Sequence, residues 1–530
     1  MIDCMKVISI KELLEKFLNW FDKGKRKIFL TIFIIGFTSN IIVITNDIVS
    51  TDTIALSEVY IPGSWELFLG RWLLKYFGYL RFGLVSSALN STLSLITISF
   101  TGVLLIDLFK IKHKLSIFLT CILLVVSPFF TSTLISVFCS FEYSLAFFFS
   151  VLCVYLLYKI KGSILKIILP SILLACSLGL YQAYLGVTCG LCILVPLVYL
   201  LIEEETPKYI LKKLLQSLIM GVMGLIIYEV ILQISLSIFD VSMSTYGGAN
   251  EIGIKTILGI PSQLKTAYLS FYNYFMNDTI INNLIYRRHI AHLVLFILTL
   301  LTILKLYFKN KNKKSLIFNL EFIMFIILIP IALGILTIIA KDRELYSLMS
   351  APYILIYIFI FSLIEKKDTK KAFENIVYCA TILVSIFIIN SYLVMTNATY
   401  MSLRITKEKT LFTSQRIINE IYNIEEYNKD MKVLFIGTTK GDNFTNPNKV
   451  YELSSSNSLF DPLMWSEPIM CNRGWHHFIK YYLGIELKEA TIEDYNNIIN
   501  TSEFDSMNTY PNVEFIKVID DILVVKVQEK

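Results

Sequence analysis

The chain alternates long apolar stretches with short lysine clusters, and this alternation restricts the possible fold more than any other feature. A helix needs about 20 apolar residues to cross a bilayer. Only 17% of the residues are charged, against about 25% in soluble domains, which excludes a soluble globular enzyme. About eleven stretches are apolar enough to span a membrane, at roughly 28–46, 84–108, 116–137, 143–158, 164–180, 184–202, 214–238, 290–308, 316–340, 351–364 and 372–395.

Every second loop between these stretches carries a lysine cluster. Because Lys and Arg are retained on the cytoplasmic side of membrane proteins, we predict that these loops and the N-terminus are cytoplasmic. An odd number of spans then places the C-terminus outside the plasma membrane, which the chain crosses many times. Since the positive charge follows the topology, we expect no nucleic-acid partner. The clusters include Lys25, Lys112, Lys159, Lys212, Lys309 and Lys367.

The composition divides the chain into three parts. Residues 1–27 resemble an amphipathic helix lying on the cytoplasmic surface, and 28–395 form the membrane domain. The polar tail, 396–530, is predicted to be a small extracytoplasmic α/β domain. The predicted fold class is therefore mostly α, a polytopic α-helical membrane protein with a small C-terminal domain. Within the tail we expect a helix over 404–429, a strand over 432–437 and a hairpin of 513–518 with 522–527.

The first outer loop, residues 47–83, contains the most suggestive polar residues. Asp47 lies at the outer end of the first span, where an ionisable side chain indicates a function. A carboxylate there could deprotonate an acceptor hydroxyl as a general base, or it could simply cap the helix. Arg71 follows in the sequence Gly70-Arg71-Trp72, and its guanidinium suits phosphate oxygens or a lipid headgroup.

Three further outer positions are candidates for substrate binding. Glu142, in a very short loop, could hold an arginine or an acceptor sugar, or face water. Tyr181 and Gln182 join two spans, and an aromatic face beside an amide suits a sugar as well as an interfacial aromatic belt. Arg343, in a charged run, could neutralise a lipid-linked phosphate or pair internally.

Together these motifs resemble the O-antigen-modifying bacterial glucosyltransferases of the Gtr type II family, which are similar in design to GT-C glycosyltransferases. The resemblance rests on Asn46-Asp47, the Gly70-Arg71-Trp72 element and the Tyr181-to-Tyr184 turn. It implies a GT-C-like fold and a transfer of a hexose, glucose in this family, that inverts the anomeric centre. The resemblance also implies that this transfer takes place outside the bacterial plasma membrane. The implied partners are a polyprenyl-phosphate-linked sugar donor, a cell-surface glycan acceptor and the lipid bilayer.

The resemblance also implies roles for single residues. Asp47 matches the family's acid and becomes the candidate base, while Arg71 and Arg343 would stabilise the leaving phosphate. Trp72, Tyr181 and Gln182 match the substrate-binding motifs. Many relatives have two adjacent acids where this chain has Asn46-Asp47, with Asp52 five residues on, so the choice between Asp47 and Asp52 stays open. We expect no cofactor and leave a divalent metal open.

Three alternatives stay open, each with less support than the transferase. An O-antigen polymerase or ligase could use Arg287, Arg288 and His289 in the long outer loop. A transporter or flippase would need polar or broken helices at mid-depth and often internal repeats, and a structural role would leave the outer acids unexplained. The acid at the first span and the long polar tail favour the transferase.

Overall fold

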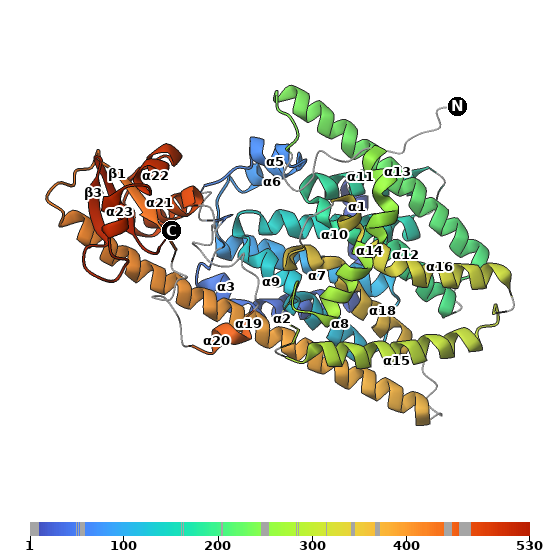
Figure 1. Cartoon of the computed structure of the whole chain (residues 1–530). Coiled ribbons are helices and arrows are strands. Elements are labelled where there is room, and N and C mark those ends of the chain that lie inside the picture. Colours follow the sequence, from blue (N-terminus) through green and yellow to red (C-terminus); the bar gives the residue numbers. More distant parts are fainter. Residues whose placement is uncertain are drawn as a thin grey trace.

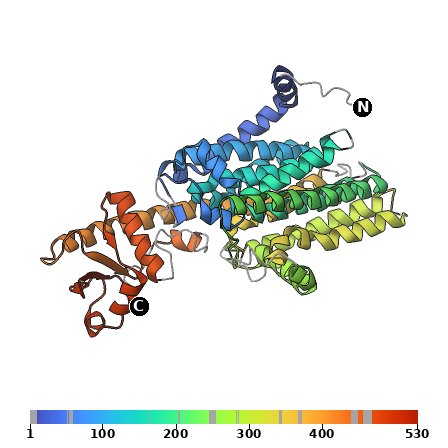
Figure 2. The same ribbon diagram turned by 90° about the horizontal axis from the view of Figure 1, so that it is seen from above.

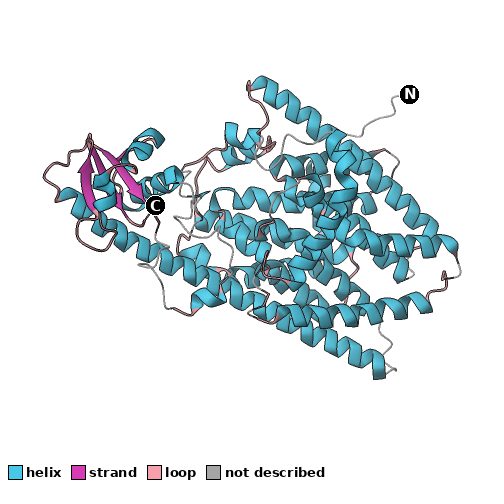
Figure 3. Cartoon of the chain, in the orientation of Figure 1, coloured by secondary structure: helices cyan, strands magenta, loops and turns pink. Residues whose placement is uncertain are grey.

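Helices dominate the chain, as Figure 3 shows, and in its described parts the strands lie near the C-terminus. We describe them from a computed structural model. It describes residues 10–529, except for 49, 51, 54–58, 161, 163, 203–204, 245–253, 282, 285, 314, 341–344, 366–371, 439–447 and 455–467.

Nine helical segments in the described residues are long and apolar enough to cross a membrane. The other two predicted spans form shorter helices, so the structure confirms a polytopic helical protein, and by length it supports nine of about eleven spans. The nine are α7 (Ser87–Leu108), α8 (Lys114–Val126) with α9 (Pro128–Ile135), η1 (Val137–Cys139) with α10 (Ser140–Lys159), η2 (Gln182–Tyr184) with α12 (Leu185–Leu201), α13 (Pro207–Ile238), α15 (Arg288–Lys309), α16 (Leu316–Leu333), η4 (Ser347–Tyr353) with α18 (Ile354–Ile364), and α19 (Ala372–Tyr422). The shorter ones are α2 (Lys23–Ser39) with α3 (Ile41–Thr45), and α11 (Leu165–Leu180).

The ends of the helices that carry the lysine-rich loops lie together. Asn310 donates a hydrogen bond to the Leu200 carbonyl, and Ser362 donates to the Phe109 carbonyl. Glu365 accepts from the backbone N–H groups of Lys112 and His113. We call this the lysine-rich end. The alternation of lysine clusters along the sequence therefore corresponds to one face of the helical body, as the topology argument requires.

The first predicted span is broken at Asn40, between α2 and α3. The Asn40 side chain is fully buried, and its amide donates to the carbonyls of Gly36 and Val125. Its carbonyl oxygen accepts from the Tyr400 hydroxyl at 2.7 Å. Because every polar atom of this amide is satisfied, the break is stable within an apolar interior. The break at Asn40 sets the direction of α3, so that Asp47, which follows α3, lies at the end of the body opposite the lysine-rich end.

The segment predicted as an outer loop, 239–289, contains the 23-residue helix α14 (Ile254–Met276), which the sequence reasoning did not foresee. Tyr268 of α14 donates to the Ile327 carbonyl of α16, and Thr266 donates to the Thr337 carbonyl of α17 (Ile335–Ile339). Figure 2 shows α14 lying across the neighbouring helices rather than along them. Its mixed polar and apolar sequence hides it from a search for continuous apolar stretches.

Helix α19 is a single helix of 51 residues, where the sequence predicted a span ending at 395 and a separate helix over 404–429. At about 1.5 Å per residue it is about 77 Å long, far more than the roughly 30 Å hydrocarbon core. In Figure 1 it runs from the lysine-rich end to the C-terminal domain. It passes the predicted domain boundary at 395/396 without a break, and the division into three domains stays a prediction.

The C-terminal domain has one four-stranded sheet of order β2-β1-β4-β3. The predicted strand and hairpin are confirmed: β1 is parallel to β4, and β3 pairs antiparallel with β4. Figure 2 shows this domain beyond the end of the helical body. Its elements are β1 (Lys432–Ile436), β2 (Lys488–Glu489), β3 (Ile516–Ile519), β4 (Ile522–Lys526), α20 (Val450–Leu453), α21 (Pro468–Leu483), α22 (Ile492–Ile498) and α23 (Ser502–Ser506).

The outer surface of the helical body is apolar. Leu218 and Ile226 on α13, Leu300 on α15 and Ile323 on α16 are all more than half exposed. Such contiguous apolar surface is rare on soluble monomers and matches a body surrounded by lipid tails. At the N-terminus, α1 (Ile10–Trp20) contacts the lysine-rich end, where Trp20 donates to the Tyr155 hydroxyl.

Candidate functional site

The turn at Gly70 determines where Arg71 points. Gly70 has φ +78°, a conformation that L side chains rarely adopt, and its backbone lies against two side chains. The Gln182 amide donates to the Leu69 carbonyl at 2.5 Å, and the Tyr228 hydroxyl donates to the Gly70 carbonyl at 3.0 Å. This turn lies between α5 (Ser64–Phe68) and α6 (Leu74–Leu80) and is therefore fixed by α13 and the η2 turn.

Arg71 lies against two tyrosine rings. Its Nη1 donates to the Tyr143 hydroxyl at 3.0 Å, and its guanidinium lies 5.0 Å from the centre of the Tyr181 ring. Among the described residues, Arg71 forms no ion pair with a carboxylate within 4.0 Å, and its Nε has no hydrogen-bond partner. A half-buried guanidinium with no counter-charge in contact is suited to bind an anion.

Two carboxylates, Glu66 and Asp52, interact electrostatically with Arg71, and of these Asp52 is the exposed one. Its side chain reaches solvent, although protein atoms surround it closely enough for burial to raise its pKa above the ordinary 3.8. The positive charge of Arg71 acts in the opposite direction and lowers the pKa of Asp52. No hydrogen-bond donor among the described residues engages the Asp52 carboxylate, so it is available to accept a proton.

Asp47 has a different environment. Its two carboxylate oxygens accept hydrogen bonds from Ser87 of α7, at 3.1 Å, and from Tyr481 of α21, at 3.4 Å. Lys407 of α19 donates to the backbone carbonyls of Asn46 and Asp47. Asp47 also has a positive φ of 48°, which Asp tolerates better than most residues. Asp47 therefore lies where the helical body meets the C-terminal domain.

Glu142 is completely buried in the first turn of α10, not exposed in a loop. Its Oε1 pairs with Arg81 Nε at 2.9 Å, and Arg81 also donates to the carbonyls of Leu84 and Phe138. The suggestion that Glu142 holds an arginine matches this geometry. A buried pair with extra hydrogen bonds ties the first outer loop to α10.

The remaining predicted site residues surround the Gly70 turn. Tyr181 is almost completely buried, and its ring centre is 4.4 Å from that of Tyr143. Gln182 contacts the backbone of the turn, and the half-buried Trp72 ring lies against Gly179 of α11. Tyr181 thus contacts Arg71 directly, Gln182 holds its turn, and Trp72 packs the turn against α11. Arg343 lies outside the described residues.

Tyr143, Arg81 and Tyr228 were missed by the sequence reasoning, although all three contact the predicted site. Arg81 could have been found as the outer-loop cation able to pair with Glu142. Tyr143 and Tyr228 lie inside apolar stretches, where the sequence offers no signal that separates them from packing residues. No group of three or more His, Cys, Asp or Glu that could hold a metal ion occurs within the described ranges.

A comparison with protein families finds one match. The family model described as glucosyl transferase GtrII matches residues 41–363, which is more than half of the chain. No curated protein and no solved structure matches the chain. The matched region contains α3, the Gly70 turn, the Arg81–Glu142 pair and the η2 turn. The chain therefore belongs to the GtrII glucosyl transferase family and is a glycosyltransferase built largely of apolar helices.

Proposed function

We propose that the chain transfers a hexose, glucose in the first instance, from a polyprenyl-phosphate donor to a cell-surface glycan on the outer face of a bacterial plasma membrane. The single observation that carries this proposal is the Arg71 guanidinium, which Tyr143 and Tyr181 hold in place and whose Nε has no hydrogen-bond partner among the described residues. The family match supplies the class of reaction. The positive-inside rule supplies the orientation.

In this mechanism Arg71 binds the donor phosphate. The hydrocarbon tail of the donor lies in the bilayer, so its phosphate reaches the headgroup level, where the Gly70 turn presents Arg71. The negative charge on the phosphate increases as the bond to the sugar breaks, and a fixed guanidinium stabilises that charge. Tyr143 and Tyr181 hold the guanidinium in place, so little reorganisation is needed.

Asp52 is our preferred general base, ahead of Asp47. A base that removes the acceptor proton needs a carboxylate that is accessible and not occupied by other donors. Asp52 meets both conditions, while Asp47 accepts from Ser87 and Tyr481. Attack by the activated hydroxyl on the face of the sugar opposite the phosphate inverts the anomeric centre in one step.

The proposed function is tested by the composition of the surface glycan in cells with and without the chain. We expect the mass of the repeating unit to increase by one hexose, and hydrolysis to identify this hexose as glucose. A change in polymer length with unchanged units would instead indicate a polymerase or ligase. An unchanged glycan would contradict the proposal, provided that the chain is present in the membrane at normal abundance.

A further inference from the structure

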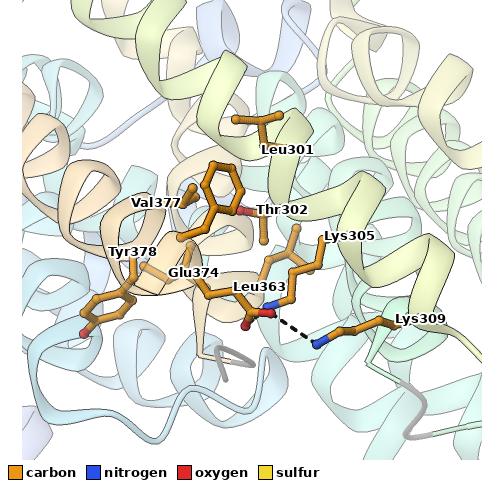
Figure 4. A pocket seen from close by; sticks show the side chains of 10 residues that line it. Leu301, Thr302, Lys305, Lys309, Leu363, Glu374, Val377 and Tyr378 are labelled. Carbon is orange, nitrogen blue, oxygen red and sulfur yellow. Dashed lines mark hydrogen bonds and ion pairs between the residues drawn. The ribbon is translucent and has the colours of Figure 1, made fainter. Parts of the chain in front are cut away.

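A pocket at the lysine-rich end lies far along the helices from the Gly70 turn. It encloses about 250 Å³ between α15, α18 and the start of α19. Figure 4 shows Leu301, Leu363 and Val377 on its apolar walls and charged side chains at one edge. Neither the family match nor the proposed transfer assigns it a role.

Among the residues that the structure describes, the charged edge of this pocket consists of Lys305, Lys309 and Glu374. Lys305 and Lys309 both pair with Glu374, the second at 3.2 Å between Nζ and Oε1. One carboxylate is thus shared between two ammonium groups. The Lys309 side chain is 49% exposed, so it can turn toward an incoming anion while Lys305 keeps the Glu374 pair.

The surface around the pocket is apolar and exposed. Leu304 and Phe308 lie exposed on α15, while Phe373 and Ile376 lie exposed on α19. A soluble anion would gain nothing from these side chains, whereas hydrocarbon chains would bury them. Basic pockets between membrane helices are suited to the headgroups of anionic lipids. The leaflet that surrounds the lysine-rich end supplies such lipids.

We propose that this pocket binds the phosphodiester headgroup of an anionic phospholipid, with the acyl chains lying along the exposed faces of α15 and α19. Lys309 contacts the phosphate while Lys305 stays paired with Glu374, and Leu301 and Val377 contact the start of the acyl chains. Because the lipid would bridge α15, α18 and α19, its binding stabilises the lysine-rich end of the body.

The test uses the purified full-length chain in detergent and four probes: dioleoylphosphatidylglycerol, dioleoylphosphatidylcholine, inorganic phosphate and a polyprenyl phosphate. Binding is measured by native mass spectrometry and by the shift in melting temperature. We expect the phosphatidylglycerol to bind and stabilise, and phosphatidylcholine and inorganic phosphate to have no effect. Stabilisation by inorganic phosphate alone, or tighter binding of the polyprenyl phosphate, would overturn the choice of occupant.

Two variants, one that removes a positive charge and one that removes a negative charge, test the roles of Lys309 and Glu374. Lys309→Gln should weaken phosphatidylglycerol binding about fivefold, the loss expected for one lysine near an anionic headgroup. Glu374→Gln should strengthen it, because both ammonium groups lose their shared counter-charge. Lys208→Gln, an exposed lysine on α13 away from the pocket, is the control with the same charge change. Equal effects of Lys309→Gln and Lys208→Gln, or weaker binding by Glu374→Gln, would contradict the proposal.

Discussion

At the scale of single residues, the two aspartates of the first outer loop have different partners. The sequence identifies both Asp47 and Asp52 as candidates but offers no way to choose between them. The choice depends on Tyr481, which lies 434 residues after Asp47 in the sequence and still donates to its carboxylate. Contacts of this kind arise only from the tertiary fold, because the first loop and the C-terminal domain are each unremarkable in local sequence.

The pKa of Asp52 predicts the pH dependence of transfer. A general base must be ionised, and burial raises the pKa of Asp52, so activity should fall with decreasing pH at a higher pH than for a fully solvated aspartate. Arg71 lowers this pKa, and Arg71→Gln should therefore move the acidic limb of the residual activity to higher pH. Rates measured across the acidic range check this, and a limb that moves to lower pH would argue against Asp52 as the base.

The Arg81–Glu142 pair predicts a test of the role of Glu142. Arg81→Leu leaves a buried carboxylate unpaired, which costs about 3–5 kcal/mol and should strongly reduce membrane abundance. The double variant Arg81→Leu with Glu142→Leu removes both charges and should recover much of that abundance. If Glu142 binds the acceptor sugar, the double variant will be abundant but inactive. Recovery of transfer together with abundance is the result that a structural role predicts.

At the scale of helices and strands, local patterns account for much of the fold. The β1 strand and the β3–β4 hairpin follow from short apolar runs beside turn residues, and most apolar stretches become helices. Helix α14 was not predicted, because two lysines and several polar residues interrupt its apolar pattern. The unbroken α19 was also missed, since a change from apolar to polar composition resembles a domain boundary even when the helix continues.

Gly70 offers the sharpest test of the turn that carries Arg71. A methyl group at this position would lie 2.4 Å from the Tyr228 hydroxyl oxygen and would require a left-handed conformation. Gly70→Ala should therefore displace Arg71 and reduce transfer by about 100-fold, the loss that a misplacement of about 1 Å can cause. Gly221→Ala is the matched control, because a methyl group there meets nothing within 4 Å. Similar activity of the two variants would show that the turn does not position Arg71.

At the scale of the whole molecule, the two ends of the helical body carry different groups. The described lysine-rich loops lie at one end, and the Gly70 turn and the C-terminal domain lie at the other. In Figure 1, helix α19 runs from the first of these ends to the second. The sequence predicted this separation from the loops alone. It did not reveal that Lys407 and Tyr481 attach the C-terminal domain to the first outer loop.

The orientation of the two ends can be measured in intact cells. Val513, on the C-terminal domain, is 80% exposed, and Lys208 lies in the first turn of α13 at the lysine-rich end. We expect a membrane-impermeant maleimide to label Val513→Cys in intact cells and Lys208→Cys only after permeabilisation. The chain without added cysteine controls for its native thiols. Labelling of Lys208→Cys alone in intact cells would reverse the orientation and place the Arg71 turn inside the cell.

The most direct test of the central claim, that Asp52 and not Asp47 acts as the general base, compares two single substitutions. Cells carrying Asp52→Asn should add no hexose to their surface glycan, while the Asp52→Asn chain stays at normal membrane abundance. Cells carrying Asp47→Asn should retain part of the transfer, since asparagine can still accept the hydrogen bonds from Ser87 or Tyr481. Normal hexose addition by Asp52→Asn, with transfer abolished by Asp47→Asn at normal abundance, would contradict the account.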